Sequence, residues 1–302
     1  MLAAVRHRVS PDVLLIITVL IWGFHFAVIK YALTHGFAPL AYAAIRFGLG
    51  SMIFAGITYG REGSLRVQRR DVWLLCGVVA VSLYLNQMSF AYSIKQTSAS
   101  TVALLFGTLP IFVGIISWLT GIERPHLREW LAIGVSFSGV ALVAADAEGG
   151  LSGDLGGILI GMLAPITWAL YSVLVSPLLR RYSPYRISTV VGLAAIVPLA
   201  ATAAPQLARE HWGDVSTLAW GAVAYSMLLS FVITNVLWFT AIDRVGANRA
   251  SIYANLQPFL GAGFAVLALG ETMSTLQIVG GIVIAAGILL ARVRRAPVSG
   301  VD

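Results

Sequence analysis

Ionisable side chains are rare inside the long apolar runs of this sequence. Two of them, an arginine and a histidine, are of types that can bind a carboxylate or carry a proton. Arg46 lies about eight residues into an apolar run, where an ionisable group is a functional candidate by default. Its guanidinium can hold a carboxylate through two parallel hydrogen bonds; pairing with helix-end carbonyls is the competing interpretation. His25 is the only histidine inside such a run, and it is either a hydrogen-bonded structural residue or a site residue that carries a proton.

Aromatic side chains accompany these groups at helical spacing. Trp22 and His25 are three residues apart, as are Trp168 and Tyr171, so each pair shares a helix face. Both tryptophans lie near the middle of their apolar runs, away from the membrane interface where tryptophan is usually enriched. We therefore expect them either to pack in the protein interior or to contact a ligand.

Amide side chains form a second related set. Gln87 shares a helix face with Tyr84, and Asn235 shares one with Trp238, because both pairs are three residues apart. Asn86 and Gln87 also correspond to Thr234 and Asn235 at a separation of 148 residues. Such residues commonly join helices within membranes, and the other interpretation is that each set gives a binding site one aromatic and one amide wall.

The same separation relates two other rare residues. Pro258 follows Pro110 by 148 residues, and Glu271 follows Glu123 by the same number. A proline within a helix frees a carbonyl and bends the helix, so Pro110 is either a static kink or part of a cavity wall. Asn255 precedes Pro258 closely enough to bind a freed carbonyl or a ligand, and the two glutamates are expected to form turns or to cap the helix that follows each of them.

Composition excludes a soluble domain. Of the 302 residues, 58% are hydrophobic and 11% charged, whereas soluble domains are about a quarter charged. About ten runs have the length of about 20 residues that a membrane-spanning helix needs. They are continuously apolar, which disfavours the short alternating strands of a barrel. The predicted helices cover residues 13–34, 38–59, 72–92, 98–119, 128–145, 155–176, 186–204, 217–240, 248–268 and 274–292.

The distribution of positive charge predicts the orientation. If the ten runs cross the membrane in turn, sixteen arginines fall on the same side of the membrane as the N-terminus. Lys95 and Arg209 fall on the other side. The positive-inside rule then places both termini in the cytoplasm. Two copies of five helices, residues 1–148 and 149–302, must be inverted relative to each other because five is odd, and inverted repeats are a recurrent plan of secondary transporters.

Several chemical classes lack support in the sequence. No Asp or Glu lies deep inside a predicted span, so the carboxylate of many proton or sodium relays is missing. The protease, hydrolase and P-loop motifs are also missing, which argues against an enzyme or an ATP-driven pump. A facilitator, an exchanger or coupling through His25 is favoured, with no cofactor and no metal.

Several segments together resemble the EamA-like branch of the drug/metabolite transporter superfamily. They are WGFHFAVIKYAL, APLAYAAIRF, FAYSIKQTSASTVALLFGTLPIFVGI, WALYSVLVSPLLRRYSP and AIDRVGANRASIYANLQPFLGAGFAVLALGE. The resemblance covers nearly the whole chain. It implies ten helices in two inverted halves, a central cavity, and transport of small metabolites, often the export of amino acids or drugs.

The sequence thus predicts an all-α integral membrane protein of ten transmembrane helices in the inner membrane, acting as an exporter or facilitator. The best candidate substrates are amino acids, aromatic ones included, moved by alternating access around a central cavity. A multidrug exporter of lipophilic cations is the alternative, and a non-transporting membrane enzyme or scaffold is a remote one. The expected partners are a small-molecule substrate and the lipid bilayer, not nucleic acid, with the chain a monomer or a homodimer. The candidate binding residues are Trp22, His25, Arg46, Tyr84, Gln87, Pro110, Trp168, Tyr171, Asn235, Trp238 and Asn255.

Overall fold

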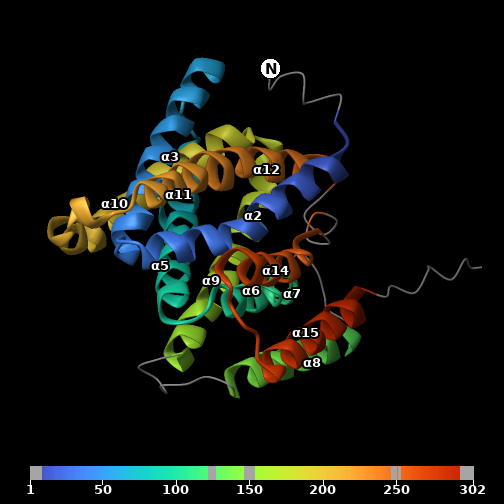
Figure 1. Cartoon of the computed structure of the whole chain (residues 1–302). Coiled ribbons are helices and arrows are strands. Elements are labelled where there is room, and N and C mark those ends of the chain that lie inside the picture. Colours follow the sequence, from blue (N-terminus) through green and yellow to red (C-terminus); the bar gives the residue numbers. More distant parts are fainter. Residues whose placement is uncertain (1–8, 122–126, 146–153, 246–249, 251–252, 293–302) are drawn as a thin grey trace, which may run out of the picture.

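The computed structural model describes residues 9–121, 127–145, 154–245, 250 and 253–292, and over these residues the chain forms helices and no strand (Figure 1). The first half contains α2 (Pro11–Thr34), α3 (Pro39–Glu62), α4 (Arg69–Val72), the π-helix η1 (Trp73–Val79), α5 (Ala80–Gln96), α6 (Ala99–Phe106), α7 (Leu109–Leu119) and α8 (Leu127–Ala145). The second half contains α9 (Asp154–Val175), η3 (Ser176–Arg180), α10 (Pro184–Arg209), η4 (Trp212–Asp214), α11 (Thr217–Met227), the π-helix η5 (Leu228–Ile233), α12 (Thr234–Val245), α14 (Gln257–Leu269) and α15 (Thr275–Arg292).

The helices have the length and hydropathy of membrane spans. Within the described ranges, seven continuous helical segments can cross a bilayer, and three shorter apolar helices lie at Gly134–Val143, Gln257–Leu269 and Thr275–Gly287. Each of the ten predicted runs therefore contains an apolar helix, although three are shorter than a full span. The chain is a multi-pass membrane protein.

Serine and proline define where several of these helices begin. Ser10 and Ser183 each precede a proline at the start of a helix, and their hydroxyls accept hydrogen bonds from Val13 N and Arg186 N at 3.3 and 3.1 Å. Proline suits the first turn because its missing N–H would have no partner there. The serine satisfies one of the N–H groups that remain.

The helix expected at residues 98–119 is interrupted, which corrects the prediction of a single helix bent at Pro110. α6 ends at Phe106, and α7 begins at Leu109 with Pro110 in its first turn. Pro258 likewise lies in the first turn of α14. The two breaks are adjacent, because a Cβ atom on Gly107 would lie 3.6 Å from Cγ of Pro258. Proline thus starts a new helix in each half, where its ring meets no preceding turn.

The two halves meet along α3 and α10, which run antiparallel. Glu62 at the end of α3 accepts a hydrogen bond from Arg186 Nε at 2.8 Å and pairs with Arg186 Nη2 at 2.7 Å, near the start of α10. Glu210, just after α10, accepts from Ala38 N, just before α3, at 3.1 Å. Glu210 follows Glu62 by 148 residues. Glutamates at equivalent positions of the two halves therefore join the halves at the two ends of this helix pair.

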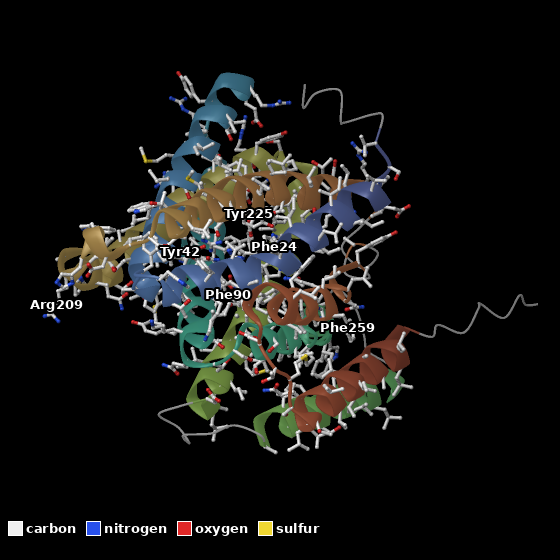
Figure 2. The ribbon with its side chains drawn as sticks, viewed as in Figure 1. Phe24, Tyr42, Phe90, Arg209, Tyr225 and Phe259 are labelled. Atoms are coloured by element: carbon white, nitrogen blue, oxygen red, sulfur yellow. The ribbon has the colours of Figure 1, made fainter. Side chains whose placement is uncertain are left out.

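Close contacts fill the rest of the core. α8 and α15 lie side by side at one edge of the molecule (Figure 1), where a Cβ atom on Gly139 would lie 2.7 Å from the carbonyl oxygen of Gly280. Phe24 of α2, which is half-buried, packs edge-on against the half-buried Tyr225 with ring centroids 5.5 Å apart (Figure 2). The Tyr225 hydroxyl donates to the carbonyl of Ile21 at 2.9 Å, so α2 is held against α11 by both packing and a hydrogen bond.

Glu271 caps a helix of the other half. Its carboxylate accepts hydrogen bonds from Ala99 N at 2.9 Å, Ser100 N at 3.0 Å and Ser100 Oγ at 2.8 Å, at the start of α6. The prediction that it caps the helix that follows it, α15, is therefore wrong. The N–H groups at the start of α6 carry partial positive charge that favours a carboxylate there, and the fold brings the end of α14 beside them. Glu123 lies outside the described residues.

We predict that Glu271→Ala lowers the apparent midpoint of thermal unfolding in detergent by about 3–6 °C. Loss of a helix cap costs about 1–2 kcal/mol, and that energy corresponds to a few degrees in a chain of this size. Glu271→Gln is the matched variant: it keeps one acceptor oxygen, so a smaller decrease is expected. Equal midpoints for the wild type and Glu271→Ala would show that the cap contributes nothing to stability.

Candidate functional site

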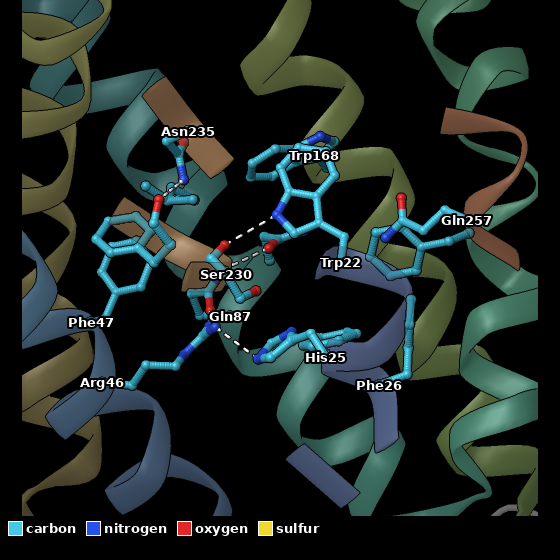
Figure 3. A pocket seen from close by; sticks show the side chains of 15 residues that line it. Trp22, His25, Phe26, Arg46, Phe47, Gln87, Trp168, Ser230, Asn235 and Gln257 are labelled. Atoms are coloured by element: carbon cyan, nitrogen blue, oxygen red, sulfur yellow. Dashed lines mark hydrogen bonds between the residues drawn. The ribbon is translucent and has the colours of Figure 1, made fainter. Parts of the chain in front are cut away.

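A cavity of about 70 Å³ lies between helices of both halves (Figure 3). Aromatic rings and hydrogen-bonding side chains make up its lining, apart from Leu83. The lining residues are Trp22, His25, Phe26, Arg46, Phe47, Leu83, Asn86, Gln87, Phe90, Phe106, Trp168, Ser230, Phe231, Asn235 and Gln257.

Arg46 occupies one side of this cavity as a buried cation, with 5% of its surface exposed. Its Nη1 donates to His25 Nε2 at 3.2 Å, and its Nη2 donates to Gln87 Oε1. Its Nε has no hydrogen-bond partner among the described residues. Neither of its two hydrogen bonds goes to a helix-end carbonyl, which was the competing interpretation of this residue.

No carboxylate of the described chain compensates this charge. The two ion pairs found among the described residues are Arg181 with Asp71 and Arg186 with Glu62, both outside the cavity. Burial of an unpaired charge is costly, and a pairing anion offsets that cost. The guanidinium in the cavity lining thus carries a charge that the described residues leave unbalanced and a buried donor, Nε, without a partner among them, and a guanidinium can hold a carboxylate.

A series of hydrogen bonds through two side-chain amides connects Arg46 to the second half of the protein. Gln87 accepts from Arg46 and donates through Nε2 to Asn86 Oδ1 at 2.9 Å. Asn86 in turn donates to the carbonyl of Ala164, on α9, at 2.8 Å. The position of the guanidinium is thereby linked, through two buried amides, to a helix of the opposite half.

Aromatic rings form much of the remaining wall. Trp22 meets Trp168 edge-on at 5.5 Å between ring centroids and lies 5.1 Å from Trp238. Phe26, Phe90 and Phe106 contact one another at 5.4 to 5.6 Å. Such a wall offers ring faces and edges to an apolar or aromatic side chain.

The π-helix η5 fixes one of these rings. Trp22 Nε1 donates to the carbonyl of Ser230 at 3.1 Å, and Thr234 Oγ1 donates to the same carbonyl at 2.6 Å. Ser230 lies within η5 (Leu228–Ile233). A π-helical turn disturbs the regular hydrogen-bond ladder and often occurs at functional sites. Here its carbonyl orients the indole of Trp22 across the interface between the halves.

Six of the candidate residues from the sequence line this cavity, and five do not. Those in the lining are Trp22, His25, Arg46, Gln87, Trp168 and Asn235. Asn235 also donates to Phe231 O at 2.7 Å, a bond within its own helical segment.

The other five occupy the surrounding structure. Tyr171 is buried behind Trp168, with ring centroids 5.3 Å apart, and Trp238 is buried beside Trp22. Tyr84 packs in the hydrophobic core and Pro110 lies in the first turn of α7. Asn255 is 8% exposed and lies just before α14, outside the cavity lining.

Sequence reasoning did not select several lining residues. Phe90 follows Gln87 by three residues and shares its helix face, so spacing could have indicated it. Gln257 precedes Pro258, where a bond to a freed carbonyl and contact with a ligand are both open from the sequence, and Phe106 precedes the other helix break, a position that only the repeat indicates. Ser230 contributes a backbone carbonyl to Trp22, for which the sequence carries no signal.

The cavity has room for about two water molecules, whereas sites for small molecules usually enclose about 300–1,000 Å³. Larger cavities lie at the two ends of the α3–α10 pair. One, of about 410 Å³, includes Arg61, Tyr182 and Val236 in its lining. The other, of about 340 Å³, includes Gly36 and Gln206. A helix movement that joined the central cavity to either of these two would enlarge the site. Among the described residues, no three His, Cys, Asp or Glu side chains come together to hold a metal.

Comparison with known proteins shows the family and the fold of this chain. The EamA-like transporter family matches residues 9–145 and 155–293, one segment in each half. A crystal structure with 18% sequence identity has a TM-score of 0.64, and the alignment covers 94% of this chain and 96% of that one. That structural likeness concerns the fold alone.

Three curated relatives are similar over most of their length. An uncharacterized transporter of Archaeoglobus fulgidus is 27% identical over 95% of this chain and 98% of the relative. The uncharacterized transporter YyaM of Bacillus subtilis is 26% identical over 89% of each chain. A protein of Escherichia coli named as a probable amino-acid metabolite efflux pump is 23% identical over 93% of this chain and 94% of the relative. The two matched segments cover most of the chain, which therefore belongs to the EamA-like transporter family.

Proposed function

We propose that this membrane transporter moves small carboxylate-containing metabolites, with amino acids, aromatic ones included, as the substrates that fit best. The observation that carries the proposal is the buried Arg46, which faces the central cavity without a carboxylate partner among the described residues. The name of the Escherichia coli relative, a probable amino-acid metabolite efflux pump, supports the same substrate class.

The proposed binding mode uses both walls of the cavity. The substrate carboxylate pairs with the Arg46 guanidinium at Nη1, in place of His25, and offsets a charge that no carboxylate among the described residues balances. The side chain of the substrate lies against Trp22 and Trp168, which meet edge-on in the present state. Gln87 and Asn235 supply amide groups to the remaining polar atoms of the substrate.

Transport proceeds by alternating access in this proposal. Two inverted halves of five spans each, residues 1–148 and 149–302, rock about the antiparallel α3–α10 pair. The cavities at the two ends of this pair become the entrances from either side of the membrane. Both termini lie in the cytoplasm, the protein is in the inner membrane, and the chain acts as an exporter or facilitator.

A second candidate is a multidrug exporter of lipophilic cations, which the ring cluster around Trp22 favours because cations bind to aromatic faces. Arg46 weighs against it, since a second positive charge beside a buried guanidinium is repelled. The two candidates respond oppositely to removal of that charge, which makes them separable.

We predict that Arg46→Gln lowers the apparent affinity for amino acids about 10- to 100-fold, because a charged hydrogen bond contributes about 1.5–3 kcal/mol. The measurement is exchange of labelled amino acids by purified protein in proteoliposomes. Arg70→Gln, at an exposed position outside the cavity, is the matched control and should behave as the wild type. Unchanged amino-acid affinity in Arg46→Gln, or stronger binding of lipophilic cations alone, would favour the second candidate.

Trp168→Leu should weaken exchange of phenylalanine more than exchange of alanine. An aromatic pair contributes about 0.5–1.5 kcal/mol beyond its buried area, so the ratio of the two apparent affinities should shift about three- to tenfold. Trp168 is half-buried in the lining, and leucine retains most of the apolar contact. Equal losses for both substrates would mean that this ring only supports the fold.

Topology is tested by cysteine labelling in a Cys76→Ser background. A membrane-impermeant thiol reagent should reach Arg66→Cys from the cytoplasmic side only and His211→Cys from the other side only. Both positions lie outside the helices that we propose to span the membrane. Labelling of both from one side would contradict the proposed orientation.

A further inference from the structure

The hydrogen bond between His25 and Arg46 fixes the protonation state of the histidine. Arg46 Nη1 lies 3.2 Å from His25 Nε2. A guanidinium has only donors and keeps its charge at every physiological pH. His25 Nε2 must therefore be the acceptor, which means that it carries no proton in this state and that the ring is neutral.

Arg46 is the charged group that faces His25 from the described residues around the cavity. From α3, Tyr42 also lies near the guanidinium, but its hydroxyl is engaged with Ser226. From α11, the Tyr225 hydroxyl is bonded to Ile21 O. The lining residues on α5, α6, α9, η5, α12 and α14 include no ionisable group; they are Leu83, Asn86, Gln87, Phe90, Phe106, Trp168, Ser230, Phe231, Asn235 and Gln257. A proton on His25 would thus place a second positive charge against the first with no compensating carboxylate.

A bound carboxylate changes this balance. It neutralises the guanidinium and draws its N–H groups toward the ligand, which releases Nε2 of His25. The imidazole then gains an anion within reach, and an opposite charge favours the protonated form. His25 stacks on Phe90 at 5.7 Å between ring centroids, so the ring can keep its place while its hydrogen-bond partner changes.

We propose that a carboxylate on Arg46 and a proton on His25 bind together, so that one proton travels with each substrate molecule in the same direction, outward when the concentration gradient of the substrate drives export. The inference rests on the proposed function and adds the coupling ion to it. The proton comes from water as the substrate binds and returns to water as the substrate leaves and the bond between Arg46 and His25 forms again. Because linkage is reciprocal, the substrate binds more tightly as the pH falls.

The first test is the pH dependence of exchange in proteoliposomes with equal pH on both sides, with L-phenylalanine as the probe. Between pH 8.5 and 5.5 the apparent affinity of the wild type should rise, by up to tenfold per pH unit. His25→Gln should exchange with reduced affinity and show no such rise. His35→Gln, at an exposed position on the C-terminal side of the same helix, is the matched control and should retain the full rise.

The second test observes the histidine directly by ¹⁵N NMR of the protein in nanodiscs, with the His25 signal identified by its loss in His25→Gln. Without ligand, His25 should remain neutral at pH 6, and Arg46→Gln should allow it to titrate. An equimolar mixture of the twenty amino acids should convert the wild-type signal to the protonated form at pH 6.

The outcomes separate the two proposals. Absence of any amino-acid exchange contradicts the proposed function and the coupling with it. Exchange that is independent of pH, or a pH dependence that survives His25→Gln, contradicts the coupling alone. A His25 signal that is protonated without ligand at pH 6, or that stays neutral with the amino-acid mixture, also overturns it.

Discussion

One buried positive charge determines how the centre of this protein is organised. Arg46 is nearly inaccessible to solvent, and its hydrogen bonds go to the neutral acceptors His25 and Gln87. In a membrane interior, such a charge is expensive and usually marks a substrate or ion pathway. The aromatic wall, the series of hydrogen bonds to Ala164 and the small cavity are all arranged around it. An anionic ligand is the partner that this arrangement lacks among the described residues.

Contacts between the two halves surround Arg46, and they are of different kinds at the ends and at the centre of the helices. At both ends of the α3–α10 pair a glutamate joins the halves, Glu62 through Arg186 and Glu210 through the backbone of Ala38. Glu271 adds a third link at the start of α6. These links lie at the ends of helices, while the centre is held by side-chain contacts around Trp22. In the proposed rocking motion, contacts at one end of the pair exchange while the two antiparallel helices stay together.

The sequence predicted the class of fold and about half of the candidate site, because both depend on local patterns. Apolar runs and the 148-residue separation indicated two related helical halves, and rare polar residues inside the runs indicated the cavity. What it missed depends on contacts between distant segments. The helix breaks before Pro110 and Pro258, the link from Glu271 to α6 and the carbonyl of Ser230 that holds Trp22 each need the second half in place. Spacing could not tell that Tyr171 and Trp238 support the wall from behind.

The most direct test of the central claim is an experimental structure of the protein with a transported amino acid bound. The account predicts the carboxylate within hydrogen-bond distance of the Arg46 guanidinium, the bond to His25 Nε2 broken, and the substrate side chain against Trp22 and Trp168. A ligand bound elsewhere, with Arg46 still donating to both His25 and Gln87, would contradict it.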